Sequence, residues 1–148
     1  MKANSCNTRL SSLEQAKSVL ITLKQRMSFT LATPKELLEE LCNNTRFNDC
    51  RYLHIAESLY DKYGFEEAWK KALFESEQAF QRDDIQLINQ LGSILGRCDL
   101  STQQQQMEQI LQQLDEIIKR AEKQNDDKRR MYLSLGTLAG FMSAVLLI

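Results

Sequence analysis

Residues 128–148 read KRRMYLSLGTLAGFMSAVLLI, in which Lys128, Arg129 and Arg130 precede an uncharged run from Met131 to Ile148. Eighteen residues of α-helix rise roughly 27 Å, close to the ~30 Å hydrocarbon core of a bilayer. The three cations form a positive-inside signal, which predicts that everything upstream lies on the cytoplasmic side. The alternative is an amphipathic or buried terminal helix, but the run has no polar face for solvent. This stretch therefore predicts a transmembrane anchor.

Upstream of this anchor, the composition is that of one helical domain. The chain has 148 residues, with one proline and five glycines, which leaves little room for β-turns. Nineteen basic and twenty acidic residues give a net charge of −1, so no overall field favours nucleic acid as a partner. The first residues are polar and lack the apolar stretch of a signal peptide. We expect a polar N-terminal segment at 1–12, a cytoplasmic helical bundle at 13–127, and a basic juxtamembrane segment with a transmembrane helix at 128–148.

Several helices begin at recognisable capping residues. Ser11 or Ser12 is a good N-cap for the first helix. The sharpest start signal is Thr33-Pro34-Lys35-Glu36, which combines a capping box with a proline at the first helical position. Asp83 or Asp84 is expected to cap a later helix. These signals divide the upstream chain into short helices.

Apolar residues at helical spacing fill the intervals between these signals. Trp69 belongs to one such stripe and is expected to be buried between helices. Gly64 is expected to end a helix in the left-handed conformation. The expected helices span about 12–27, 34–42, 52–63, 65–78, 84–95 and 102–148. The predicted fold is all-α, a compact bundle of about six helices whose long C-terminal helix, roughly 70 Å in length, continues into the transmembrane anchor.

The sequence offers no recognisable enzymatic motif. It contains one histidine, His54, and no glycine-rich phosphate loop, GxSxG or HExxH. Cys50 and His54 are four residues apart, and together with Cys42 and Cys98 they suggest a zinc site. Because these spacings match no structural zinc pattern, we expect buried free thiols and a surface histidine instead. We predict a protein that is not an enzyme, without a catalytic, cofactor or metal site.

Residues 91–99, LGSILGRCD, form the first candidate functional feature. Gly92 inside a helix costs up to ~1 kcal/mol relative to alanine, which suggests a close helix approach. Gly96 is expected to end that helix, and Asp99 to cap the turn into the next one. Two interpretations remain open. The segment is either a tight corner between two helices or a corner that docks a partner through a projecting Arg97.

The second feature is a GxxxG motif inside the apolar run, formed by Gly136 and Gly140. Small residues four apart let two helix backbones approach closely in lipid. Since glycine is common in membrane helices, the motif alone is weak. We expect these two glycines to contact another transmembrane helix.

The stretch from Leu91 to Gln103 is similar to the pattern LGxxLGxxDxxxQ of the stage III sporulation protein AB family of endospore-forming Firmicutes. Gln103 thereby joins Gly92, Gly96, Arg97 and Asp99 as a docking candidate. Three further pieces agree in order, and the similarity extends from about residue 13 to residue 148. These pieces are Thr33-Pro34 with Glu36-Leu37, Ala68-Trp69 with Ala72-Leu73, and Leu135-Gly136 with Gly140.

The resemblance implies a cytosolic bundle similar to the cytoplasmic domains of the F protein of type II secretion and its type IV pilus counterpart. It also implies a non-catalytic scaffold in the complex that joins mother cell and forespore, placed in the mother-cell membrane around the forespore. The implied partners are an ATPase resembling secretion ATPases and other membrane components of that complex. Family members usually begin with an apolar membrane segment, whereas residues 1–12 are polar. We therefore expect one spanning helix where the family typically has two.

The alternative function is a tail-anchored helical adaptor in a related secretion or pilus assembly platform outside sporulation. Genomic neighbourhood separates the two hypotheses, because sporulation genes favour the first and secretion or pilus genes favour the second.

Overall fold

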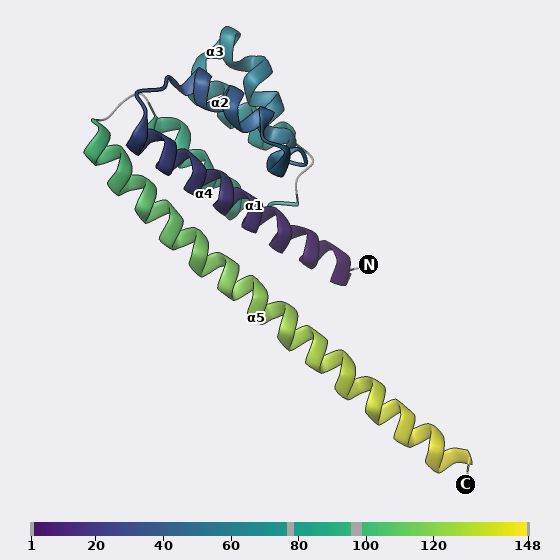
Figure 1. The fold of residues 1–148 in the computed structure, drawn as a ribbon. Coiled ribbons are helices and arrows are strands. Elements are labelled where there is room, and N and C mark those ends of the chain that lie inside the picture. Colours follow the sequence, from purple (N-terminus) through teal and green to yellow (C-terminus); the bar gives the residue numbers. More distant parts are fainter. Residues whose placement is uncertain (1, 77–78, 96–98, 148) are drawn as a thin grey trace.

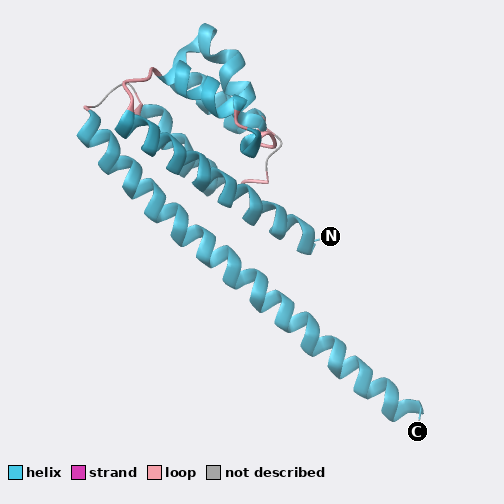
Figure 2. Ribbon diagram, in the orientation of Figure 1, coloured by secondary structure: helices cyan, strands magenta, loops and turns pink. Residues whose placement is uncertain are grey.

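The computed structural model describes residues 2–76, 79–95 and 99–147, and these residues form only helices and loops (Figure 2). The described residues form five α-helices and one short 3-10 helix. The elements are α1 (Lys2–Phe29), α2 (Pro34–Asn43), η1 (Thr45–Phe47), α3 (Arg51–Glu75), α4 (Arg82–Ile94) and α5 (Leu100–Leu147). The all-α prediction is confirmed.

The helices pack in chain order, and the last one closes the bundle against the first. α2 packs on α3, α3 on α4, and α4 on α5, while α1 lies along α5. Figure 1 shows α1 and α5 running antiparallel, with α2 and α3 on the opposite side of the bundle. Ion pairs between Lys17 and Asp115 (2.7 Å) and between Lys24 and Glu108 join α1 to α5. The hydrogen bond that Lys17 donates lowers the pKa of the half-buried Asp115 carboxyl. Ion pairs near the surface contribute little to stability.

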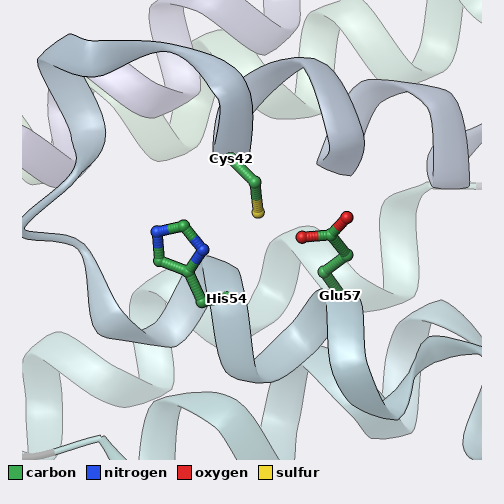
Figure 3. A group of neighbouring side chains, drawn as sticks. All are labelled: Cys42, His54 and Glu57. Carbon is green, nitrogen blue, oxygen red and sulfur yellow. The ribbon is translucent and has the colours of Figure 1, made fainter.

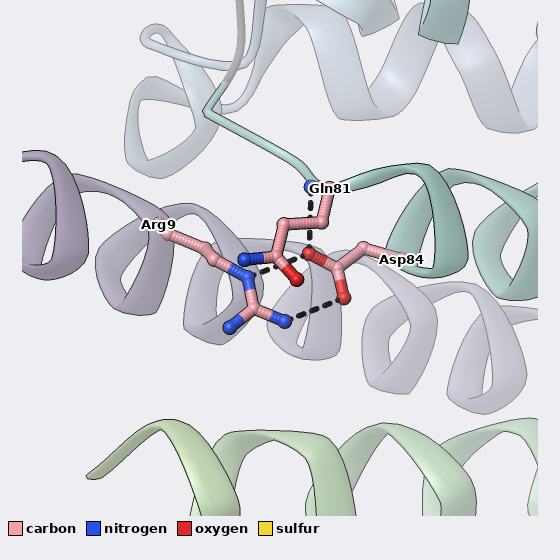
Figure 4. Close-up of polar contacts among 3 residues, drawn as sticks. All are labelled: Arg9, Gln81 and Asp84. Atoms are coloured by element: carbon pink, nitrogen blue, oxygen red, sulfur yellow. Dashed lines mark hydrogen bonds and ion pairs between the residues drawn. The ribbon is translucent and has the colours of Figure 1, made fainter. Parts of the chain in front are cut away.

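The first helix starts earlier than predicted. α1 begins at Lys2, so the expected start at Ser11 or Ser12 is wrong. Ser12 is 6% exposed and sits inside the helix. A tertiary contact lies in the added part of the helix: Arg9 donates to both carboxylate oxygens of Asp84, at 2.9 Å each (Figure 4). The polar segment expected at 1–12 therefore takes part in the bundle at least from Arg9.

Asp84 also organises the start of α4. Its side chain is fully buried, and it accepts a hydrogen bond of 2.9 Å from the backbone N–H of Gln81 (Figure 4). Gln81 is the N-cap residue, so the prediction that Asp83 or Asp84 occupies that position is wrong by two or three residues. A buried carboxylate needs such partners, because an unpaired one is costly to desolvate.

The capping box at Thr33 is confirmed. The Thr33 hydroxyl accepts from the Glu36 N–H at 3.3 Å, and the Glu36 carboxylate accepts from the Thr33 N–H at 2.8 Å. Pro34 is the first residue of α2, where its missing N–H removes no helical hydrogen bond.

Gly64 interrupts the helix, as predicted, but the left-handed helical conformation expected for it is wrong, and the chain resumes as helix directly afterwards. Its backbone angles are φ 79° and ψ 176°, a region that essentially only glycine adopts. The two helices expected at 52–63 and 65–78 are therefore the two arms of one kinked element, α3. This is why the structure has five helices where the sequence predicts about six.

The core lies between Leu13 and Ala121 and takes residues from every helix. Its largest member is Trp69, which is 1% exposed, so the predicted burial is confirmed. The indole ring stacks on Phe65 and meets the edge of Tyr52, with both ring centroids 5.7 Å away. The indole Nε1–H donates to the carbonyl of Ile88 at 3.0 Å, which links α3 to α4. Among the described residues, the core includes none after Ala121.

α5 is one continuous helix, as predicted, and only its first half packs on the bundle. It runs for 48 residues, or roughly 70 Å. Its buried residues end at Ala121, and the rest extends beyond the bundle (Figure 1). The helix thus has a packed arm that ends at Ala121, a charged stretch at 122–130 and an unpacked apolar arm at 131–147.

Candidate functional site

The corner between α4 and α5 holds the described docking candidates, and Gly92 is the most buried of them. A Cβ atom built on Gly92 would lie 3.4 Å from the Cα of Glu66 and 3.4 Å from Cδ1 of Trp69. The close helix approach predicted from this glycine is therefore confirmed, and α3 is the partner. A side chain larger than alanine would have no room at this position.

Replacing Gly92 with leucine is expected to lower the free energy of unfolding by about 1–3 kcal/mol. The added atoms would have to displace the Glu66 backbone or the Trp69 ring. Gly92→Ala is the matched control, because its Cβ meets ordinary contact distances while alanine favours helix by about 1 kcal/mol. Urea denaturation of both variants measures the difference. A leucine variant as stable as the alanine variant would contradict the close approach.

Asp99 and Gln103 hold the chain at the start of α5. The Asp99 carboxylate accepts hydrogen bonds from the hydroxyl and the N–H of Thr102, which confirms that Asp99 caps this helix. The bond from the hydroxyl, followed by the one from the N–H, lowers the pKa of this exposed carboxyl. The Gln103 side-chain amide donates to the carbonyl of Ile94 at 3.3 Å, next to the C-cap of α4. Both side chains therefore make local contacts that shape the corner, and Asp99 is also exposed.

The other two docking candidates, Gly96 and Arg97, lie outside the described residues. Docking at this corner stays a prediction for them and for the three residues above.

The unpacked arm of α5 carries the other predicted site residues. In the described part of the chain, one helix is long and apolar enough to cross a membrane, and its apolar window is 0% buried. Gly136 and Gly140 lie in this arm, and a Cβ on either would meet no atom within 4 Å. Lys128, Arg129 and Arg130 are exposed directly before it. The arm therefore presents mainly apolar side chains that are exposed among the residues the structure describes.

The structure separates the cysteines that the sequence offers as zinc ligands. Cys42 lies near His54, but Cys50 points elsewhere, and its Sγ is 3.8 Å from Oε1 of Gln15. Burial raises the pKa of the Cys50 thiol. Cys98 lies outside the described residues. The third potential ligand beside Cys42 and His54 is Glu57, which sequence reasoning missed. The signal that would have found it is the spacing of three between His54 and Glu57, which places both on one face of a helix.

Comparisons with known proteins give one match over the whole chain. The family model for stage III sporulation protein AB matches residues 1–148. Among curated proteins, the chain is 34% identical over 96 residues to the DNA-binding transcriptional activator HyfR of Escherichia coli (strain K12). That match covers 63% of this chain and 14% of the activator, so it concerns a small part of the longer protein. No solved structure matches the chain.

Proposed function

The chain belongs to the stage III sporulation protein AB family, and we propose its role from this membership and from the structure. In this role it is a non-catalytic scaffold of the channel complex between mother cell and forespore. Its bundle docks the secretion-like ATPase of the complex, and its last helix anchors it in the cell membrane and contacts other membrane components there.

The observation that carries the anchoring half is the division of α5 into two arms. Buried hydrophobic residues end at Ala121, whereas Phe141 is 69% exposed and Leu147 is 88% exposed. Apolar side chains on all faces of a helix are stable in lipid and unfavourable in water. The cations at 128–130 favour the cytoplasmic side for the bundle.

The GxxxG motif supports contacts with other membrane components. Among the described residues, no other helix lies within 4 Å of a Cβ built on Gly136 or Gly140, so their surface is available to a second transmembrane helix. Close backbone approach at such glycines gives association in lipid without a hydrophobic driving force.

The docking half rests on the position of the α4–α5 corner. The corner lies at the opposite end of α5 from the C-terminus (Figure 1). From Leu100 to Lys128 the helix rises roughly 42 Å, so an upright α5 would hold the corner well away from the bilayer surface. A cytoplasmic ATPase could reach it there without contacting lipid.

An ATPase pull-down tests this proposal. The bait is the fragment 1–127, which contains every buried hydrophobic residue of the core, alongside the full chain in native membranes. We expect both baits to retain the ATPase. Arg97→Ala is expected to weaken binding at least about tenfold, or ~1.4 kcal/mol, with an unchanged thermal midpoint. Binding by neither bait would exclude docking, and wild-type binding by Arg97→Ala would exclude that residue.

A further inference from the structure

Three potential metal ligands converge between α2 and α3. Cys42 stands in the last turn of α2, and His54 and Glu57 stand one turn apart near the start of α3. Their side chains point toward one another (Figure 3), and one ligand atom from each lies within 4.8 Å of the others. Two helices that are separate in sequence thus present sulfur, nitrogen and oxygen donors to one space.

We propose that Cys42, His54 and Glu57 bind a zinc ion that links the end of α2 to the start of α3. A thiolate, an imidazole and a carboxylate are all ordinary zinc ligands, whereas Mg²⁺ and Ca²⁺ prefer all-oxygen sites. Three protein ligands leave a fourth tetrahedral position, and because His54 is exposed, water can reach it.

The distances between the three ligand atoms require only a small movement of the side chains to bind the ion. With zinc bonds of about 2.0–2.3 Å, tetrahedral ligand atoms lie roughly 3.4–3.6 Å apart. The three ligand atoms lie within 4.8 Å of one another without the ion, so the longest distance between them has to shorten by about 1 Å when zinc binds. His54 is exposed and Glu57 is partly exposed, so both side chains have room to rotate. Cys42 is 9% exposed and would act as the fixed point.

The local charge favours a cation. Burial, then the hydrogen bond and the negative charge of Glu57, and then the charge of Glu39 raise the pKa of the Cys42 thiol to about 12. Glu57 and Glu39 place negative charge near the sulfur, which favours a cation there. Binding exchanges the thiol proton for zinc: the Sγ–H bond breaks, the proton leaves to the buffer, and the sulfur donates its electron pair to zinc.

Metal titration of the full chain tests the site. The protein is purified in detergent through a tag without histidine, stripped with a chelator, and titrated with Zn²⁺ against a chromophoric competitor. We expect one zinc ion per chain and a higher thermal midpoint when zinc is present. Co²⁺ in place of zinc should show a thiolate-to-cobalt charge-transfer band. An excess of Mg²⁺ should displace neither ion.

Three single variants assign the ligands. Cys42→Ser, His54→Gln and Glu57→Gln should each weaken zinc binding at least about 100-fold, beyond the 10–100-fold that partners outside the ligand set cost. Cys50→Ser is the matched control, because its thiol lies beside Gln15, and it should bind like wild type. His54→Gln keeps the test valid if Cys42→Ser fails to fold, since His54 is exposed. Failure of the wild type to retain zinc, or equal binding by His54→Gln, would overturn the proposal.

Discussion

Replacing Trp69 with alanine is expected to lower the free energy of unfolding by about 3–5 kcal/mol. The side chain is 1% exposed and lies where α3 meets α4. Alanine would leave a cavity beside Phe65 and Tyr52, and it would remove the donor to the Ile88 carbonyl. Gly92 of α4 packs against the same ring, so the substitution would also remove packing between α3 and α4.

Thermal and urea denaturation measure this loss. For a chain of this size, 3–5 kcal/mol corresponds to a fall of about 6–20 °C in the midpoint. Trp69→Phe should lose less, because it keeps a ring and removes only the hydrogen bond and part of the volume. Phe74→Ala is the matched control, since Phe74 is an aromatic residue of the same helix that is 59% exposed. A Trp69→Ala midpoint within a degree of wild type would contradict this account of the core.

The parts of the fold that sequence reasoning predicted are those that depend on neighbouring residues. The Thr33 capping box needs only residues 33–36, and the break at Gly64 needs only one glycine without a Cβ. Stripes of apolar residues likewise place Trp69 on a buried face through helical spacing alone. In each case the physical cause lies within a turn or two of chain.

The parts that it missed depend on pairing across the fold. Arg9 and Asp84 are 75 residues apart. This pair adds a tertiary contact to the part of α1 that precedes its expected start, and no local pattern indicates that the two residues meet. The same holds for Cys42, His54 and Glu57, because the packing of α2 on α3 brings the sulfur to the other two.

The family pattern LGxxLGxxDxxxQ acquires a structural explanation at its described positions. Gly92 packs against α3, Asp99 caps α5, and Gln103 donates to the Ile94 carbonyl. The last of these contacts joins the start of α5 to the end of α4. A pattern that maintains a corner also sets the surface that the corner presents, so structural and docking roles are compatible in one segment.

Deleting Met131–Ile148 is expected to move the protein from the membrane fraction to the soluble fraction. The deletion removes the apolar arm of α5 and leaves every buried core residue in place. The remaining chain should keep its helical circular dichroism and its cooperative unfolding, because the bundle does not depend on the arm. Its association should be weak or absent, since the proposed contacts at Gly136 and Gly140 are lost with it.

The control is a full chain in which Lys128, Arg129 and Arg130 are all replaced by glutamine. This variant keeps the apolar arm, so it should stay with the membranes after a high-salt wash, which removes proteins held by surface charge alone. Its orientation should become less uniform, because the positive-inside signal is gone. Protease accessibility of the bundle in inside-out vesicles measures that orientation. If the deleted protein also stayed with washed membranes, a second membrane contact would have to exist in the bundle, and α5 could not be the sole anchor.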